Sequence, residues 1–152
     1  SFDTPDYSAY LAEEKAILAN LKKVFLMVAG AAVQKYGEAL EQHQQLLLSA
    51  SDILIDIYMA ESAILRTEKN AKRYGEDSQK IQLAMTQLFL YRTVENITKN
   101  AKEGIVSFAE GDEQRMMLMG LRRFTRYQEY PVITDLRTQI ADHVIAKDGY
   151  HF

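Results

Sequence analysis

Two of the three histidines stand close to carboxylates, the combination from which metal sites and acid–base pairs are built. His43 follows Glu41 at a spacing of two, and His143 is adjacent to Asp142. A di-metal carboxylate bundle needs Glu-x-x-His on two helices, because positions three apart project together into the core. The sequence contains no Glu-x-x-His. We therefore interpret His43 as a solvated histidine and His143 with Asp142 as a surface pair, and we expect no metal site.

Nucleophiles and phosphate-binding turns are the next candidates for chemistry. The chain has no cysteine, which excludes thiolate nucleophiles, disulfides and cysteine-type zinc sites. Ser49, Ser51 and Ser62 lie within a helical pattern and lack the sharp turn that exposes a catalytic serine. Neither G-x-G-x-x-G nor G-x-x-x-x-G-K is present to bring backbone amides to a phosphate. We predict that the chain carries no catalytic residue and no cofactor-binding residue.

A basic amphipathic segment spans residues 113–127. One face carries Arg115, Arg122 and Arg126, and another carries Met117, Leu121 and Phe124. Such a helix can lie on a membrane surface or bind an acidic partner. We favour an ordinary surface helix whose arginines pair with nearby acidic residues. Met116, Met117 and Met119 form an adaptable apolar patch, which we interpret as core filler rather than a docking groove.

The composition is that of an ordinary globular domain. The chain has 152 residues, 47% of them hydrophobic, and a net charge of −3. A negative charge disfavours broad nucleic-acid binding, which needs a basic surface. No apolar run approaches the roughly 20 residues of a membrane span, and the longest covers residues 24–33. We expect a cytoplasmic location, and because the chain begins with Ser1 we interpret it as a piece of a longer protein.

Helical periodicity runs along nearly the whole chain and predicts about five helices. Thr4-Pro5 has the form of a helix start, and Gly37 and Gly75 have the form of helix ends. The expected helices run from Thr4-Pro5 to Tyr36, from between Glu38 and Gln45 to Tyr74, from an Asp77 or Ser78 cap to Phe108, from an Asp112 cap to about Tyr127, and from Pro131 onward. Short loops predict antiparallel neighbours. The expected architecture is a single all-α domain, with residues 1–37 as a long linking helix and 38–152 as the bundle.

Steps of three and four also predict which side chains face inward. On the first helix they are Tyr7, Tyr10, Leu11, Ile17, Leu18, Leu21, Val24, Phe25, Val28, Ala32 and Tyr36. On the second they are Leu47, Ala50, Leu54, Ile57, Ala60, Ile64 and Leu65. On the third they are Leu83, Leu90, Val94, Ile97, Ala101, Ile105 and Phe108, and on the last they are Val132, Ile133, Leu136, Ile140 and Val144.

Residues 52–66 read DILIDIYMAESAILR. This stretch resembles the helix D-x-x-I-D-L-Y-x-M-x-x-x-L-S-R-A in the C-terminal extension of very-long-chain acyl-CoA dehydrogenases. Residues 21–43 are similar to the long helix ahead of it in that family, and residues 135–152 to its closing helix and short tail. The resemblance therefore covers most of the chain, although the third and fourth helices match mainly in position and length.

The resemblance implies a helical domain from a larger enzyme. In that family FAD, the acyl-CoA pocket and the catalytic glutamate belong to a preceding catalytic module, on which the extension packs. The extension is associated with a dimer, and the family's membrane-associating segment lies at or ahead of the edge of the matched region. On this basis the parent oxidises long fatty acyl-CoA thioesters and passes electrons to an electron-transfer flavoprotein, while this chain has a structural role and binds no FAD alone. The alternative from the residues is a free-standing helical adaptor.

An excised extension would leave bare the face that meets its catalytic module. The first helix is the expected site of that face, because it would join the two modules and carries Tyr7, Tyr10 and Phe25. Monomers rarely expose large apolar patches. We therefore expect the chain to form a homodimer, the commonest oligomer. A first helix that completes its own bundle, leaving a monomer, is the alternative.

Overall fold

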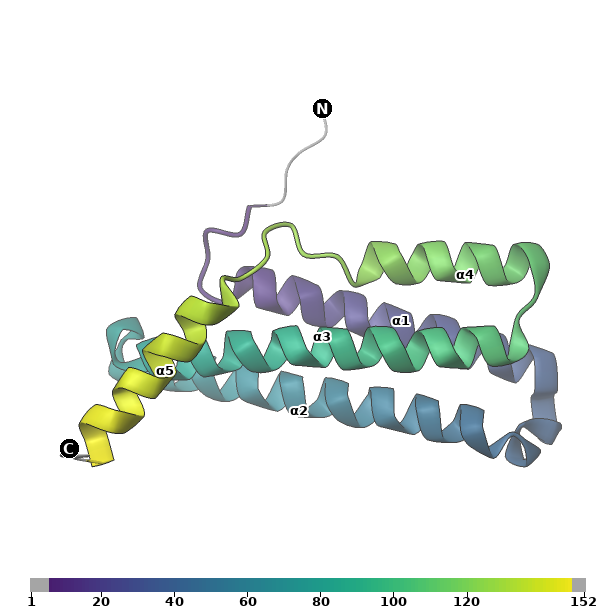
Figure 1. Ribbon diagram of the computed structural model, residues 1–152, viewed down its shortest axis with the longest axis horizontal. Helices are drawn as coiled ribbons and strands as arrows, with labels where there is room; N and C mark the ends of the chain where they lie inside the picture. Colours follow the sequence, from purple (N-terminus) through teal and green to yellow (C-terminus); the bar gives the residue numbers. More distant parts are fainter. Residues whose placement is uncertain (1–5, 149–152) are drawn as a thin grey trace.

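Five α-helices joined by short turns form the structure, a computed structural model that describes residues 6–148 (Figure 1). The helices are α1 (Ala12–Tyr36), α2 (Gln44–Tyr74), α3 (Lys80–Phe108), α4 (Gly111–Phe124) and α5 (Ile133–Asp148). Short 3-10 helices, η1 (Gly37–Gln42) and η2 (Glu76–Gln79), join the first three. Within residues 6–148 there is no strand. The predicted all-α architecture of about five helices is confirmed.

The chain enters α1 through a turn rather than through the predicted cap. Thr4-Pro5 lies outside the described residues, and α1 begins only at Ala12. The Asp6 carboxylate accepts a hydrogen bond from the Ser8 amide at 2.9 Å, and Leu11 adopts a left-handed φ of 61°. Since a left-handed leucine interrupts the helical path, the prediction that Tyr7 and Tyr10 belong to the helix was wrong. The Leu11 side chain is nevertheless buried in the core, and this burial offsets the conformational cost.

Two glycines end the long helices, as predicted. Gly37 has φ 51° after α1, and Gly75 has φ 91° after α2. Glycine lacks the Cβ that makes positive φ costly, so both positions let the chain reverse. The predicted cap of α3 was wrong, because Asp77 and Ser78 lie within η2, where the Ser78 hydroxyl donates to the Gly75 carbonyl at 2.6 Å.

The bounds of α4 differ slightly from the prediction. Gly111 already belongs to the helix and Glu110 is its cap residue, so Asp112 sits in the first turn rather than at the cap. The helix ends at Phe124, three residues before the expected Tyr127. There the Leu121 carbonyl accepts hydrogen bonds from the Thr125 hydroxyl at 2.7 Å and from the Thr125 amide at 3.1 Å, so the terminal turn has a side-chain donor beside its backbone bond.

α1, α2 and α3 lie side by side as the long rods of the bundle, and α4 lies along α1 and α3 (Figure 1). α1 packs against α2, α3 and α4, and α2 packs most extensively against α3. The fully buried side chains come from these three rods: Leu21, Val24, Val28, Ile53, Ile64, Leu90, Val94, Ile97 and Ile105. Burial of each such side chain contributes roughly 1.5–3 kcal/mol, so this seam is the main source of stability.

α1 packs against α2, α3 and α4, but Leu26 and Val33 on it are 65% and 54% exposed. Phe25 is half-buried against the core, and Tyr10 packs there too. The expectation that the first helix carries the exposed face was therefore wrong for these aromatics. Within residues 6–148, Ala12–Gln42 is the one helical segment that is long and apolar enough to span a membrane, by length and composition alone. The sequence analysis missed it, because it considered only uninterrupted apolar runs. A third of its most apolar 18 residues is buried in the bundle, and the core helix of a soluble protein can pass the same composition test.

The inner face of α3 is confirmed: Leu90, Val94, Ile97, Ala101, Ile105 and Phe108 are buried, and Leu83 packs against the core. On α2 the prediction was confirmed at three positions and wrong at two. Ile57, Ala60 and Ile64 face inward, but Leu54 and Leu65 are 51% and 50% exposed. Ile53, which was not predicted, is fully buried, and Leu47 and Ala50 are half-buried. Because α2 is apolar on more than one face, periodicity identified only part of its inner face.

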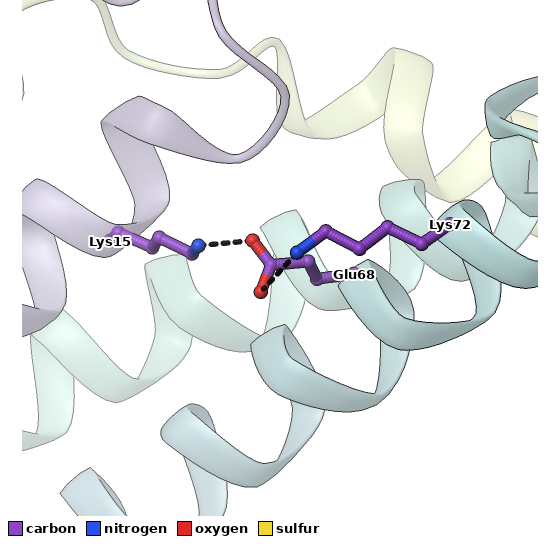
Figure 2. A network of polar contacts seen from close by, with 3 residues as sticks. All are labelled: Lys15, Glu68 and Lys72. Atoms are coloured by element: carbon purple, nitrogen blue, oxygen red, sulfur yellow. Dashed lines mark hydrogen bonds and ion pairs between the residues drawn. The ribbon is translucent and has the colours of Figure 1, made fainter.

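Polar contacts fix α2 to both of its neighbours. Glu68 of α2 forms an ion pair with Lys15 of α1, and Lys72 approaches the same carboxylate at 3.9 Å (Figure 2). On the other side, the buried hydroxyls of Thr67 and Thr86 share a hydrogen bond of 2.9 Å between α2 and α3. This bond satisfies two polar groups that would otherwise be costly to bury.

α5 is the most loosely held helix. It crosses α3 obliquely (Figure 1) and packs against no other described helix. None of its residues is fully buried. Ile133, Leu136 and Ile140 are half-buried, as a face turned towards α3 should be. Val132 and Val144 are exposed, so their predicted inward position was wrong.

Candidate functional site

The predicted histidines make no catalytic arrangement. His43 is half-buried and stacks on Tyr36 with ring centroids 3.6 Å apart, so its interpretation as a solvated histidine was wrong. His143 and Asp142 are both exposed on α5, and they form no ion pair there. Residues 6–148 contain no group of three or more histidines or carboxylates arranged to hold a metal ion.

The three serines lie in α2, where the sequence placed them. The Ser62 hydroxyl donates to the Tyr58 carbonyl at 2.9 Å, one helical turn earlier. A hydroxyl bonded back to its own helix is a common arrangement for a serine within a helix. Ser49 and Ser51 make no side-chain hydrogen bond within the described part of the chain. None of the three is arranged as a nucleophile with a base.

The basic surface is formed by residues that differ in part from the predicted arginines. Arg115 pairs with Asp112 at 2.7 Å, as expected for an ordinary surface helix. Arg126 lies beyond the end of α4, so helical spacing does not place it with Arg115. A groove of about 540 Å³ is lined instead by Lys23, Arg123 and Arg126, together with Phe124. Lys23 lies 5.8 Å from the centre of the Phe124 ring.

Of the three methionines of α4, only Met117 is buried. Its interpretation as core filler fits, while Met116 and Met119 are exposed. Gly120 lets α4 approach α1 closely, because a Cβ built there would meet the Met27 sulfur at 2.9 Å.

An acidic cavity of about 300 Å³ lies where the start of α1 meets the segment that leads into α5. Glu13 and Glu14 line it from α1, and Glu129 and Asp135 line it from the other side. The Gln87 side chain of α3 donates to Glu14 at 2.9 Å. The remaining lining is apolar or aromatic: Ile17, Leu90, Tyr127, Tyr130, Pro131, Val132 and Leu136.

Two polar atoms beside this cavity are buried and have no hydrogen-bond partner in the described structure. They are the Tyr127 hydroxyl and one carboxylate oxygen of Glu13. Burial raises the pKa of the Glu13 carboxyl, and the nearby Glu14 charge raises it further. Burial also raises the pKa of the Tyr127 phenol, with Glu14 and Glu13 adding to the effect. Glu13 is therefore the poorly solvated carboxyl of this cavity, whereas Glu129 and Asp135 are exposed.

An apolar groove of about 470 Å³ follows α2 and α3 on the surface. Tyr58, Met59, Met85 and Phe89 line it, with Arg66 and Gln82 among the polar residues. A second hollow of about 410 Å³ shares Met85 and Phe89 and extends to Ile140 of α5. Tyr58 is 72% exposed, which is unusual for an aromatic side chain beside other apolar groups.

Both the acidic cavity and this groove were missed by the sequence argument. The cavity joins residues more than a hundred positions apart, so no spacing in the sequence indicates it. The groove contains Tyr58 and Met59 of the motif at 52–66, to which the sequence argument gave neither an inward position nor a surface role. An excess of apolar residues over one helical face was the signal that could have revealed it.

Comparison with known proteins gives a consistent result. The family "Acyl-CoA dehydrogenase, C-terminal domain" matches residues 20–123. A Bacillus subtilis (strain 168) protein named "Probable acyl-CoA dehydrogenase" is 38% identical over 134 residues, which cover 88% of this chain and 23% of that protein.

The crystal structure of an acyl-CoA dehydrogenase complexed with FAD from Bacillus anthracis superposes with a TM-score of 0.88 at 36% identity. It covers 95% of this chain and 25% of that one. The chain thus spans about a quarter of the length of these relatives, and a free-standing adaptor is not favoured. The chain belongs to the family of acyl-CoA dehydrogenase C-terminal domains.

Proposed function

We propose that this chain is the C-terminal helical domain of an FAD-dependent acyl-CoA dehydrogenase, where it packs on the catalytic module and sets the oligomeric state. The parent would be a dimeric, cytoplasmic enzyme of the very-long-chain type that oxidises long fatty acyl-CoA thioesters. The chain itself would contribute no catalytic, cofactor-binding or metal-binding residue. Support comes from the matched relatives, which extend over about four times the length that the chain covers.

The observation that carries the proposal is the apolar surface of α2 and α3. Its exposed members are Leu54, Ile55, Tyr58, Met59, Leu65, Met85 and Phe89. A set of this size on two adjacent helices is more than a monomer normally leaves in water. The chemistry fits an interface with another folded module, whose apolar surface would bury these side chains.

Three of the five helix starts carry side chains that do not fit the phosphates of FAD. A flavin dinucleotide places its phosphates against backbone amides at a helix start, where negative charge is favoured. Here the first turns of α1, α4 and α5 carry acidic side chains: Glu13 and Glu14, Asp112 and Glu113, and Asp135. These carboxylates would repel a phosphate. We therefore assign FAD to the catalytic module of the parent and derive no step through it here.

A reconstitution experiment tests the proposed packing. The parent's catalytic module and this chain would be produced separately, mixed, and followed by size-exclusion chromatography and calorimetry. We expect association that is strongly weakened by Tyr58→Asp combined with Met85→Asp. Met116→Asp is the matched control, because Met116 is equally exposed but lies on α4. Unchanged association of the Tyr58/Met85 variant would remove the proposed interface.

A flavin titration tests the assignment of FAD. We expect the isolated chain to show no shift of the FAD absorbance spectrum, while the catalytic module alone does. Stoichiometric yellow flavin copurifying with this chain would contradict the assignment.

A further inference from the structure

A second apolar face lies on the outside of α1 and α4, away from the α2–α3 surface. Leu26 and Val33 of α1 are more than half exposed, and so are Met116 and Met119 of α4. The two helices lie side by side (Figure 1), so their outward side chains belong to one continuous face. A monomer seldom leaves several large apolar side chains together in water, and packing on a catalytic module through α2 and α3 would leave these four uncovered.

Along α4 this face is complementary to itself. Its outward stripe consists of Asp112, Met116, Met119 and Arg123, which are all exposed. They follow one another at steps of four, three and four residues, a spacing that keeps side chains on one side of a helix. When the stripe is turned end over end about its midpoint, methionine meets methionine and the carboxylate meets the guanidinium. The stripe therefore matches a second copy of itself that runs in the opposite direction.

α1 has the same property. Leu26 and Val33 are seven residues, or two helical turns, apart on its outward side. Gly30 lies near their midpoint, is exposed, and has no atom within 4 Å of the place where a Cβ would stand. When α1 is turned end over end, Leu26 of one copy meets Val33 of the other, and glycine near the centre lets the two backbones come close.

The two midpoints lie at the same level of the bundle. A Cβ built at Gly120 would meet Met27. Lys23, one turn earlier on α1, lies over the ring of Phe124, one turn later on α4, so the two helices run antiparallel with a fixed offset. Three residues from Gly120 towards the start of α4, and three residues from Met27 to Gly30, lead to both midpoints. A single two-fold axis can therefore serve both helices at once.

We propose that the outward face of α1 and α4 binds a second copy of this chain about that axis. Asp112 of each copy then lies beside Arg123 of the other, and these two ion pairs close the ends of an apolar seam. Arg123 forms no ion pair within residues 6–148, while Asp112 pairs with Arg115 of its own helix and keeps an exposed carboxylate. The inference rests on the proposed role of the domain in setting the oligomeric state, and it names the surface that does so.

The shared axis identifies the partner as a second copy. Opposite charges at the two ends of a helix also suit its dipole, so the charges of α4 alone do not decide. A two-fold interface requires that every contact be matched by its mirror contact in the other half. Both α1 and α4 meet this requirement about one level, which an unrelated partner does not need.

The size of the face sets the strength of the dimer. α4 has 14 residues, so the face is roughly 20 Å long, and two adjacent helices make it roughly 20 Å wide. Its projected area of about 400 Å² is below the roughly 800 Å² that each partner contributes to a standard interface. We therefore expect a weak and reversible dimer of the isolated chain.

Sedimentation equilibrium tests the dimer and its charge pairs. The unsubstituted chain should show a reversible doubling of mass between about 10 μM and about 1 mM. Asp112→Arg and Arg123→Asp should each weaken the dimer about tenfold at low salt, because each brings like charges together at both ends of the seam. Glu103→Arg, an equal change of charge at an exposed site on α3, is the matched control and should leave the dimer unchanged.

An equal mixture of the two weakened variants tests the two-fold arrangement itself. In a mixed dimer of Asp112→Arg with Arg123→Asp, every carboxylate of the seam again lies beside a guanidinium. The mixture should therefore dimerise about as well as the unsubstituted chain, although neither variant does so alone. A strictly monomeric mass of the unsubstituted chain at the highest concentration would overturn the proposal. A mixture that associates no better than its components would overturn it as well.

Failure of this inference can be distinguished from failure of the proposed packing on the catalytic module. Tyr58→Asp combined with Met85→Asp changes the α2–α3 surface and should leave this dimer intact. Asp112→Arg should leave the association with the catalytic module intact, because it lies on α4. A dimer lost in the Tyr58/Met85 variant would place the contact between copies on α2 and α3, and would overturn the inference.

Discussion

Lys22 of α1 and Glu61 of α2 form an ion pair with an N–O distance of 2.8 Å, and this pair repeats the one between Lys15 and Glu68. Lys15 lies seven residues before Lys22 on α1, and Glu68 lies seven residues after Glu61 on α2. Seven residues are two helical turns, so both pairs report the same antiparallel register. Exposed pairs of this kind contribute little free energy, and their main effect is to make any other register unfavourable.

Reversing the charge of Lys22 tests this register. Lys22→Glu should lower the free energy of unfolding by about 0.5–1 kcal/mol, because it places like charges side by side. The combined Lys22→Glu and Glu61→Lys variant should recover most of the loss. Urea unfolding at low and high salt would measure both. The expected recovery disappears at high salt, where the pair is screened, and recovery that is independent of salt would contradict an ionic origin.

Core truncation on α2 separates the observed inner face from the predicted one. Ile57→Ala should cost about 2–5 kcal/mol, because Ile57 is buried and its loss leaves a cavity. Leu54→Ala should change the stability of the isolated chain by no more than about 0.5 kcal/mol, as expected for a surface position. Thermal melts of the two variants provide the comparison. Equal losses would place Leu54 in the core and contradict the structure.

The buried Thr67–Thr86 pair suits a double-mutant cycle. Thr67→Val should cost about 1–2 kcal/mol, because it leaves the Thr86 hydroxyl buried without its partner. The double valine variant should lose less than the sum of the two single losses, since neither polar group then remains. Denaturant unfolding of the four proteins gives the coupling free energy. Strict additivity would mean that the hydroxyls do not interact.

Much of the fold follows from local sequence, including the inner face of α3, whereas the inner face of α2 was predicted only in part. Gly37 and Gly75 end their helices as predicted, because positive φ is a local requirement that glycine meets. On α2, Ile53 and Leu54 are equally apolar, and only contact with α3 decides which is buried. The acidic cavity depends on Glu13 meeting Tyr127, a tertiary event with no local pattern. Leu11 also departs from prediction, because its left-handed conformation depends on core burial that no propensity describes.

Because the pKa of Glu13 is raised, replacing it with a neutral residue should increase the stability of the fold by an amount that depends on pH. A carboxyl whose pKa is raised on folding favours the folded state when protonated, so this contribution is present at acidic pH and is lost as pH rises through the folded pKa. Glu13→Gln should therefore raise the melting temperature at pH 7 and leave it nearly unchanged at acidic pH. Calorimetric scans across pH measure this. A lower melting temperature at pH 7 would show that the charge is already compensated.

Gly30 offers a stabilising substitution. It lies within α1, is exposed, and has no atom within 4 Å of the place where a Cβ would stand. Gly30→Ala should raise the free energy of unfolding by about 0.5–1 kcal/mol, because alanine loses less backbone entropy in a helix. Gly37→Ala is the contrasting variant, since its φ of 51° strains any residue with a Cβ. Urea unfolding should show a gain for the first and a loss for the second.

Because α5 is only loosely packed, the domain should unfold in two steps, with α5 opening before the other helices. With no fully buried residue and α3 as its one helical neighbour among the described elements, α5 can detach while α1 to α4 remain folded. Amide protons of α5 would then exchange with solvent through this partial opening, ahead of those in the central seam. Pro131, Val132 and Leu136 close one side of the acidic cavity, so the same opening would admit water to the Tyr127 hydroxyl. The opening that exposes the amides of α5 is thus also the opening that makes the buried Tyr127 hydroxyl accessible.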